Sequence, residues 1–389
     1  MAERLFRDLV SAFSAIFNST NSLIRIITFL DTNNSTLATL VNEDEDEMFA
    51  DFIKVVEAFN LTCMTLLHNG NQPEPPRQRY LLFPDFLSSQ FPGRDLLSEL
   101  IIRPWLLYDM TGETVESFTS IVRDVTPIVE ALNMQGEERD RISYTKLTTP
   151  NRILLVFIWL RKYQTLSELS TLFLVSPSVI QRNIALIVPI LSQYFLNYIR
   201  WPTDEEWRRK IGQWNSFPEA VAIIDGTLHE VYRPMTDPQE LYYSGRVKYH
   251  CFSTQIIVDN TGHIVFVQCG FLGHQNDAGQ WQHIAPPIGP GMPNSLPDNT
   301  YILADRGYPN EEPLLTPWRR QRLNGHPDRR FFNQELASCR QIVEHSIARF
   351  KEYRIISTLY RHRREDAQRV MELCAALAER HIRLSRAIR

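Results

Sequence analysis

The chain has 389 residues, of which 43% are hydrophobic, and a formal net charge of −4. This length leaves room for two or three domains, and the hydrophobic content is that of an ordinary folded protein. We expect no transmembrane helix, because no apolar run reaches eighteen residues, and no signal peptide. The five cysteines are scattered without a CxxC pair, so a zinc site and a disulfide framework are not indicated, and a reducing compartment is favoured.

Residues 1–145 predict a helical N-terminal region in which we recognise no motif. Apolar residues recur at helical spacing in residues 3–30, after the acidic run 43–47, and in residues 96–133. Residues 69–94 are rich in Pro, Asn and Gln, which is typical of a connector. Such a region either packs on the core as a helical layer or contacts a partner protein.

Residues 146–200 predict a helix-turn-helix-like segment. Thr149-Pro150 is typical of a helix start, and Thr165–Glu168 has the form of a capping box. After a short turn, Ser176-Pro177 begins the next helix. In a helix-turn-helix the second helix enters the major groove, which makes Ser178, Gln181 and Arg182 candidate DNA-binding residues. A generic helical hairpin gives the same pattern, and one clear cation is few for a strong DNA reader.

Residues 201–389 predict an α/β core with a mixed sheet. The continuous apolar run 221–224 is typical of a buried strand, and we expect 229–233 to be the second strand of a hairpin. Further strands are expected at 250–258, 263–270 and 301–304, with a turn beginning at Asp259 and a helix at Asn276-Asp277. Three antiparallel strands followed by alternating strand and helix indicate a mixed α/β sheet.

Three acidic residues in this core are candidate catalytic groups. Asp225 follows the apolar run 221–224, Asp305 follows the strand 301–304, and Glu344 lies in the helical stretch 333–353. Converging carboxylates can hold two divalent cations that drive in-line displacement at phosphorus. Each acid also has an ordinary interpretation. Asp225-Gly226 suits a hairpin turn, Asp305 suits an Asx turn, and Glu344 suits an exposed helix face.

The sequence around these acids resembles that of the Harbinger-type (PIF/Harbinger) DDE transposases and their domesticated relatives. The resemblance runs in the family's order within residues 146–360, through Arg200–Thr203, Ala222–Thr227, Tyr243–Arg246, His250, Gly273–Asp277, Leu303–Pro309, Arg340–Glu344 and Phe350-Lys351. One departure is Leu228-His229, which stands where the family has His directly after Thr. The resemblance implies an RNase H-like core with Asp225, Asp305 and Glu344 as its metal-binding catalytic triad.

Four further residues are candidates near this triad. Asp277 matches an acidic position of the family, although a helix N-cap explains an Asp there equally well. His274 and His250 are candidate hydrogen-bond donors around the triad, although isolated histidines more often serve structure. Arg340 lies one helical turn before Glu344 and either orients Glu344, touches a substrate phosphate or simply pairs with Glu344.

The C-terminal part is the basic one. Residues 306–389 contain 18 Lys and Arg against 10 Asp and Glu, a net charge of +8, whereas residues 1–305 carry −12. A DNA backbone is favoured here because phosphate binding is mostly electrostatic, and a solvated helix face is the alternative. The candidate DNA-binding cations in this part are Arg319, Arg320, Arg361, Arg363 and Arg364.

The resemblance implies a DNA endonuclease and strand transferase that uses Mg²⁺ or Mn²⁺, with two ions. It would cut at transposon ends and join the 3′-hydroxyl ends to target DNA. It also implies a location in the nucleus, or in the cytoplasm as well, a separate Myb/SANT-like DNA-binding partner and a homo-oligomer, with no membrane association. The alternative is a domesticated nuclear protein that acts as a DNA-associated nuclease or adaptor without transposition.

Overall fold

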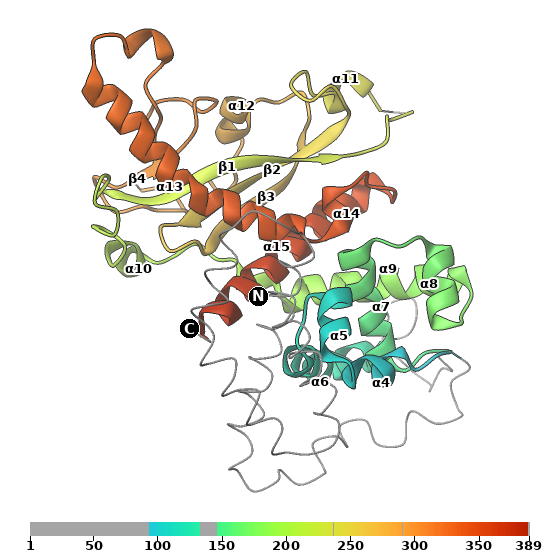
Figure 1. Ribbon diagram of the computed structural model, residues 1–389. Helices are drawn as coiled ribbons and strands as arrows, with labels where there is room; N and C mark the ends of the chain where they lie inside the picture. The colour runs from blue at the N-terminus through green and yellow to red at the C-terminus, as the bar shows by residue number, and fades with distance from the viewer. Residues whose placement is uncertain (1–92, 133–145, 236, 290, 388–389) are drawn as a thin grey trace, which may run out of the picture. The chain divides into compact units, whose positions relative to one another are not determined.

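The computed structural model describes residues 93–387, apart from residues 133–145, 236 and 290 (Figure 1). These residues belong to one compact unit, residues 86–389. The helices expected in residues 3–30 and after the acidic run 43–47, and nearly all of the expected connector 69–94, lie outside the described residues.

A five-stranded mixed sheet has the order β3-β2-β1-β4-β5 (Figure 1). Strands β1 (Ala220–Glu230), β2 (Cys251–Asp259) and β3 (Ile264–Leu272) are antiparallel neighbours. Strands β4 (Tyr301–Leu303) and β5 (Leu314–Leu315) extend the sheet from β1 in the parallel sense. The expected mixed α/β sheet is confirmed.

Strand β1 runs without interruption through Asp225 and Gly226, so the predicted hairpin with a second strand at 229–233 was wrong. Asp225 pairs with Ile256 and Gly226 with Gln255 in the antiparallel ladder. A Cβ atom on Gly226 would lie 2.9 Å from Asp277 Oδ1 and 3.0 Å from Gln255 Nε2. The glycine therefore permits a close approach of side chains to the strand and does not serve a turn.

The turn between β2 and β3 forms as expected. The carboxylate of Asp259 accepts hydrogen bonds from the backbone N–H groups of Thr261 and His263, at 2.9 and 3.0 Å. It also pairs with Lys210 Nζ at 2.7 Å. Asp259 is thus a turn residue that closes the β2–β3 hairpin.

Helices cover the sheet. Helix α13 (Pro327–Lys351) contacts β1 and β2 through buried residues such as Val343 and Phe350, and α15 (Arg364–Ala387) packs on β3. The buried side chains Val221, Ile257 and Trp207 belong to one hydrophobic cluster beneath β1 and β2. The shorter elements are α10 (Asp204–Arg208), α11 (Gln239–Tyr242), α12 (Asp277–Gln282), η3 (Arg320–Arg322) and α14 (Arg354–Ser357).

The segment before the sheet is helical, as its pattern predicts. It contains α4 (Leu96–Ile101), α5 (Pro104–Thr111), α6 (Val115–Ala131), α7 (Thr149–Lys162), α8 (Leu166–Phe173), α9 (Pro177–Tyr194) and the turn η2 (Leu196–Tyr198). The capping box at Thr165 and Glu168 is present with both of its hydrogen bonds. The N-cap of α7 is Thr148, one residue before the expected Thr149, because the Thr148 hydroxyl accepts the N–H of Asn151.

Helix α9 is the most apolar long helix of this segment. Residues 177–198 are long and apolar enough to cross a membrane on length and composition alone. However, α9 contacts α6, α7, α8 and α15, and Ile187 and Leu191 are fully buried among them. Burial within the helical layer therefore explains its apolar character.

A buried ionic cluster joins the helical segment to α15. Glu113 accepts hydrogen bonds from Ser117 and Arg380, and His381 Nε2 lies 2.9 Å from its Oε1. Burial alone would raise the pKa of Glu113, but the hydrogen bond and charge of His381, together with Arg380, outweigh it and lower the pKa. Removing one member of a buried ion pair leaves the others uncompensated, which is costly.

We expect Glu113→Gln to lower the free energy of unfolding by about 3 kcal/mol at pH 7. Because the folded-state pKa of Glu113 is lowered, its stabilisation is complete above the ordinary pKa of 4.5 and disappears as the pH falls through the lowered value. Urea unfolding at pH 7 and at stepwise lower pH measures this difference. Glu99→Gln, which breaks the exposed pair with Arg94, is the control and should change little. Equal midpoints for wild type and Glu113→Gln would contradict the prediction.

Candidate active site

Three aspartates meet where β1 and β4 run side by side. In the parallel ladder Ile223 pairs with Leu303, and continuing that register by two residues brings Asp225 beside Asp305. Asp277 is the first residue of α12, and its carboxylate lies close to Gly226 and Gly307. A Cβ atom on Gly307 would lie 2.7 Å from Asp277 Oδ2 and 2.9 Å from Asp305 Oδ1, so both carboxylates border this glycine.

The electrostatics of this aspartate cluster disfavour negative charge. Burial raises the pKa of Asp225, and the neighbouring Asp305 raises it further, against the lowering effects of Arg340 and the Gly226 N–H. Burial likewise raises the pKa of Asp277, and Asp305 and Asp225 add to it. Carboxylates held together in this way gain from a nearby cation.

Arg340 supplies a positive charge to the cluster. Its Nη2 donates to Asp225 Oδ2 at 2.9 Å, from α13 across to β1. The Asp225 side chain is 19% exposed and that of Arg340 is 24% exposed, so the pair is partly shielded from water. The acid that Arg340 pairs with is therefore Asp225 on β1, whereas Glu344 was the acid expected from the sequence. Its Nε is buried without a hydrogen-bond partner among the described residues.

The N-cap interpretation of Asp277 was wrong. Asn276 caps α12, because its Oδ1 accepts the N–H of Gly279 at 2.8 Å. The Asp277 side chain is therefore not used for capping, and its Oδ1 lies 3.5 Å from Gln255 Nε2. Asp277 thus faces the other two aspartates from the start of the helix.

A buried polar network lies beside the aspartates and was missed from the sequence. Gln255 Nε2 donates to Gln280 Oε1 at 2.6 Å, and the Tyr308 hydroxyl donates to Gln255 Oε1. Burial raises the pKa of Tyr308 well above its ordinary value, and the three aspartates raise it further, so the hydroxyl stays protonated. The available signal was Gln255 itself, an amide in the middle of β2 directly before the apolar run Ile256–Val258.

Glu344 approaches the aspartates from a different element, helix α13. It is exposed on α13, on the side that also carries Arg340 and Lys351. Arg340 reaches Asp225, and Lys351 Nζ donates to the carbonyl of Leu228 at 3.2 Å. Glu344 therefore lies on the stripe of α13 that borders β1 between these two contacts.

The donor set suits a divalent cation in its chemistry. Asp225, Asp277 and Asp305 offer hard oxygen ligands that Mg²⁺ and Mn²⁺ accept, and their mutual repulsion favours a cation between them. Among the residues that the structure describes, however, no three His, Cys, Asp or Glu side chains already form a metal-binding group. Arg340, bound to Asp225 Oδ2, provides positive charge in this arrangement.

The candidate histidines are not brought to the aspartates. His274 is exposed, and its Nδ1 lies 2.7 Å from the carbonyl oxygen of Leu241. The ring of His250 lies 5.5 Å from that of Tyr243. His229 of the divergent first motif is buried, which lowers its pKa to about 4, and its nitrogens contact Ile356 and Thr254. These contacts are structural ones within the sheet and its connections.

The candidate DNA-binding residues fall into two groups. Ser178, Gln181 and Arg182 are exposed on the first turns of α9, and Arg319 and Arg320 are exposed around η3. The remaining cations have partners within the fold: Arg361 lies over the Tyr163 ring at 4.3 Å, Arg363 pairs with Glu365 at 3.3 Å, and Arg364 pairs with Asp237 at 2.6 Å.

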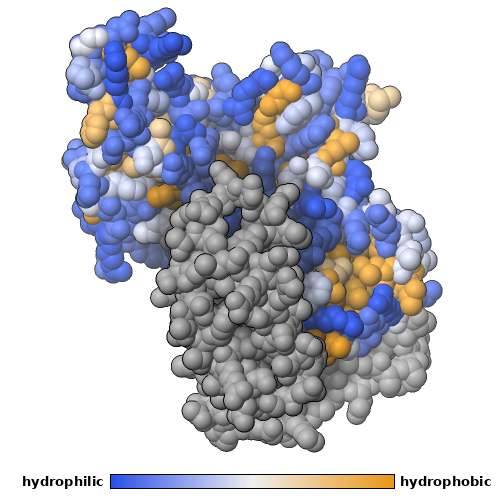
Figure 2. Space-filling view, viewed as in Figure 1, coloured by the Kyte–Doolittle hydropathy of each residue, from blue (hydrophilic) through white to orange (hydrophobic). Residues whose placement is uncertain are grey.

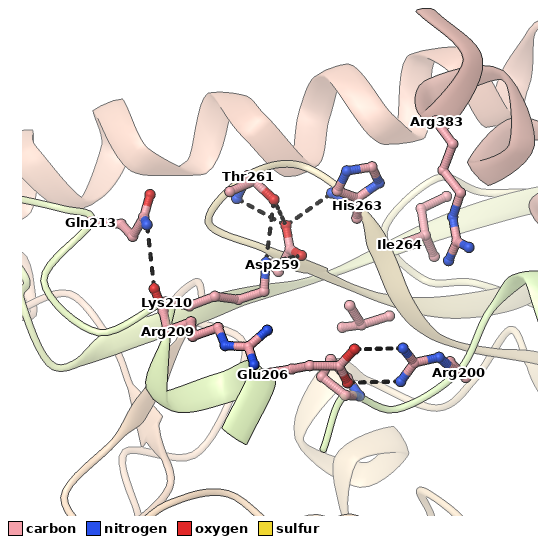
Figure 3. A pocket seen from close by; sticks show the side chains of 12 residues that line it. Arg200, Glu206, Arg209, Lys210, Gln213, Asp259, Thr261, His263, Ile264 and Arg383 are labelled. Carbon is pink, nitrogen blue, oxygen red and sulfur yellow. Dashed lines mark hydrogen bonds and ion pairs between the residues drawn. The ribbon is translucent and has the colours of Figure 1, made fainter. Parts of the chain in front are cut away.

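A cavity among the described residues lies away from the aspartates. Figure 3 shows a pocket of about 550 Å³ beside the β2–β3 turn, where Arg200, Lys210 and His263 approach from α10, its flanking loops and the turn. Its cations are paired, Arg200 with Glu206 and Lys210 with Asp259. The aspartate cluster, and not this pocket, therefore carries the unbalanced charge that catalysis requires.

Comparison with known proteins finds a family and two relatives that this chain resembles. Residues 224–379, which include all three aspartates and Glu344, match the family described as "DDE superfamily endonuclease". The chain is 28% identical to the "Putative transposase for insertion sequence element IS112" of Streptomyces albus G, over 60% of this chain and 81% of the relative. It is 25% identical to the "Probable transposase for insertion sequence element IS702" of Microchaete diplosiphon, over 65% and 86%. No solved structure matches.

These matches support an enzyme of the nuclease or transposase class, in which residues 224–379 are similar to DDE superfamily endonucleases. Endonucleases of this superfamily generally use divalent metal ions, and DNA is the substrate that such an enzyme implies.

We expect Arg340→Gln to raise the pKa of Asp225 further, because a favourable charge on its carboxylate is lost while its burial and Asp305 remain. Carboxyl ¹³C NMR of protein labelled at aspartate measures the titration without added metal. Arg349→Gln, on an exposed position of the same helix, is the control. A pKa of Asp225 that stays constant or falls in Arg340→Gln would show that the ion pair does not set the charge of the cluster.

Proposed function

We propose that this DDE superfamily endonuclease is a Harbinger-type transposase that cuts DNA at transposon ends and joins the 3′-hydroxyl ends to target DNA. The observation that carries the proposal is the cluster of Asp225 in β1, Asp305 just after β4 and Asp277 at the start of α12, within the segment that matches the endonuclease family. The alternative is a domesticated relative that acts as a nuclease or adaptor without transposition. Both curated relatives are named as transposases, which favours the mobile interpretation.

The proposed ligands of two Mg²⁺ or Mn²⁺ ions are Asp225, Asp305 and Glu344, with Asp277 as a fourth carboxylate. Bound ions would supply an activated water and charge stabilisation at the attacking and leaving oxygens. Asp225 occupies the central position, since it neighbours Asp305 along the sheet and faces α13. Glu344 belongs to the set because its stripe of α13 borders β1 beside Asp225.

The chain's other residues prepare this site for a phosphodiester. Gln255 and Tyr308 form a fixed polar floor beside Asp277, which limits the movement of its carboxylate. Arg340 holds Asp225 in place and presents a guanidinium at the point where substrate phosphate oxygens would arrive. These residues orient groups and balance charge around the reacting phosphorus.

The wider biological setting follows from the Harbinger resemblance alone. We propose a nuclear location, with the cytoplasm as a second site, a Myb/SANT-like DNA-binding partner and a homo-oligomer. Arg182 is the clear cation at the start of α9, so a separate protein that reads the DNA sequence is compatible with this surface. Terminal inverted repeats flanking the coding sequence would favour the mobile element, and their absence would favour the domesticated alternative.

The test combines Mn²⁺ calorimetry with nicking of supercoiled plasmid in Mg²⁺ or Mn²⁺. We expect Asp225→Asn and Asp305→Asn each to weaken Mn²⁺ binding at least about 10-fold and to abolish nicking, because they remove direct metal ligands. Glu344→Gln and Asp277→Asn test the other two carboxylates. The substitution of a direct metal ligand should weaken Mn²⁺ binding more than the substitution of a carboxylate that only lies nearby. The control is Asp298→Asn, in an exposed loop.

Two outcomes would reject the nuclease mechanism. One is the absence of metal binding by the wild type, even with DNA present. The other is binding that none of the four substitutions weakens. A loss of binding in Asp277→Asn without a loss in Glu344→Gln would replace Glu344 by Asp277 in the ligand set.

A further inference from the structure

The loop before α13 and the first turns of that helix form a strongly basic projection. Residues 317–334, called here the arginine arm, contain five arginines and one acidic residue, Asp328, a net charge of +4 with His326 neutral. In Figure 1 this segment extends beyond the edge of the sheet at the upper left. Figure 2 shows a predominantly hydrophilic surface over this part of the molecule.

The positive charge of the arm is not balanced within the described part of the chain. Arg319, Arg320 and Arg322 are exposed, and no described carboxylate lies within ion-pair distance of them. Arg208 and Arg209 are also exposed, but they are paired with Asp204 and Glu205. Unpaired cations that repel one another on a short segment are typical of a surface that binds an anionic polymer.

The arm is held in a defined shape by its own contacts. Asn333 accepts the N–H of Trp318 at 2.8 Å and donates to its carbonyl at 2.9 Å. Arg329 donates to the carbonyl of Arg322 at 2.9 Å, which ties the start of α13 to η3. Phe332 packs edge-on against buried Phe217 at 5.1 Å and anchors the arm to the loop before β1. The arm thus presents its free guanidinium groups from a fixed base.

Two exposed aromatic rings lie among these cations. Trp318 is 36% exposed, and the Arg329 guanidinium lies 4.5 Å from its ring centroid. Phe331 is 62% exposed. Exposed rings beside guanidinium groups are the combination that stacks on nucleic acid bases while cations contact the phosphates. Paired bases inside a duplex hide their faces, so stacking requires an unpaired base.

We propose that the arginine arm binds a DNA end with unpaired bases, through phosphates on Arg319, Arg320 and Arg322 and through base stacking on Trp318 or Phe331. The inference rests on the proposed function, which makes DNA the ligand. It adds that the enzyme binds a DNA end with unpaired bases. The guanidinium groups bind the backbone of any DNA, and the aromatic rings distinguish an unpaired end from a blunt one.

The phosphate contacts are tested by the salt dependence of DNA binding. Fluorescence anisotropy without divalent metal, at several NaCl concentrations, compares a blunt duplex with the same duplex carrying a single-stranded 3′ extension. The triple variant Arg319→Ala, Arg320→Ala, Arg322→Ala should reduce the slope of log Kd against log salt by about 3 on both probes, roughly one for each lost phosphate contact. The control variant Arg123→Ala, Arg208→Ala, Arg209→Ala removes three exposed, paired arginines and should leave the slope nearly unchanged.

The stacking contact is tested on the same probes. Trp318→Ala or Phe331→Ala should weaken binding of the extended duplex by about 5-fold or more and leave the blunt duplex nearly unchanged. Trp105→Ala, on the exposed side of α5, is the matched control. Equal losses on both probes in both aromatic variants would overturn base stacking, and an unchanged salt slope in the arginine triple variant would overturn phosphate binding by the arm.

The outcomes also separate this inference from the proposed function. A wild-type protein that binds DNA through the arm but never nicks it in Mg²⁺ or Mn²⁺ counts against the nuclease mechanism and leaves the arm in place. A triple variant that binds and nicks DNA as the wild type does overturns the role of the arm and leaves the nuclease mechanism in place.

Discussion

The repulsion among three aspartates is the constraint on which this structure depends. The parallel register of β1 and β4 places Asp225 beside Asp305, and the start of α12 adds Asp277. Burial and mutual repulsion raise the pKa of Asp225 and Asp277. A positive charge near the aspartates is therefore stabilising, and Arg340 of α13 provides one by its hydrogen bond to Asp225. The placement of α13 across the sheet is thus tied to the charge of the three aspartates.

The hydrogen-bonded polar side chains and the two glycines beside the aspartates make room for a buried carboxylate. Gln255, Gln280 and Tyr308 satisfy one another's hydrogen bonds beneath the aspartates, so a polar group can be buried in β2 without an orphaned atom at that position. Gly226 and Gly307 leave the volume that the Asp277 carboxylate fills. The same few residues therefore set both the charge and the packing of the site, so a substitution that alters one also alters the other.

Much of this fold could be predicted from local patterns, because capping residues and apolar periodicity act over a few positions. The capping box at Thr165, the start of α12 and the strand before Asp305 follow from such patterns. The continuity of β1 did not, since pairing with β2 overrides the turn preference of Asp225-Gly226. Arg340 and Asp225 meet across 115 residues, and no local pattern encodes such a contact. The role of Glu344 stays a prediction.

The buried cluster around Glu113 has a consequence for the order in which the chain can fold during synthesis. Its partner Arg380 follows 267 residues later, on the helix that also packs on β3. Until the ribosome has made that helix, the acid on the helical layer has no counter-charge and the third strand lacks its cover. The helical layer and the sheet therefore reach their native packing together and late, and a nascent chain must keep these apolar surfaces from other molecules until then.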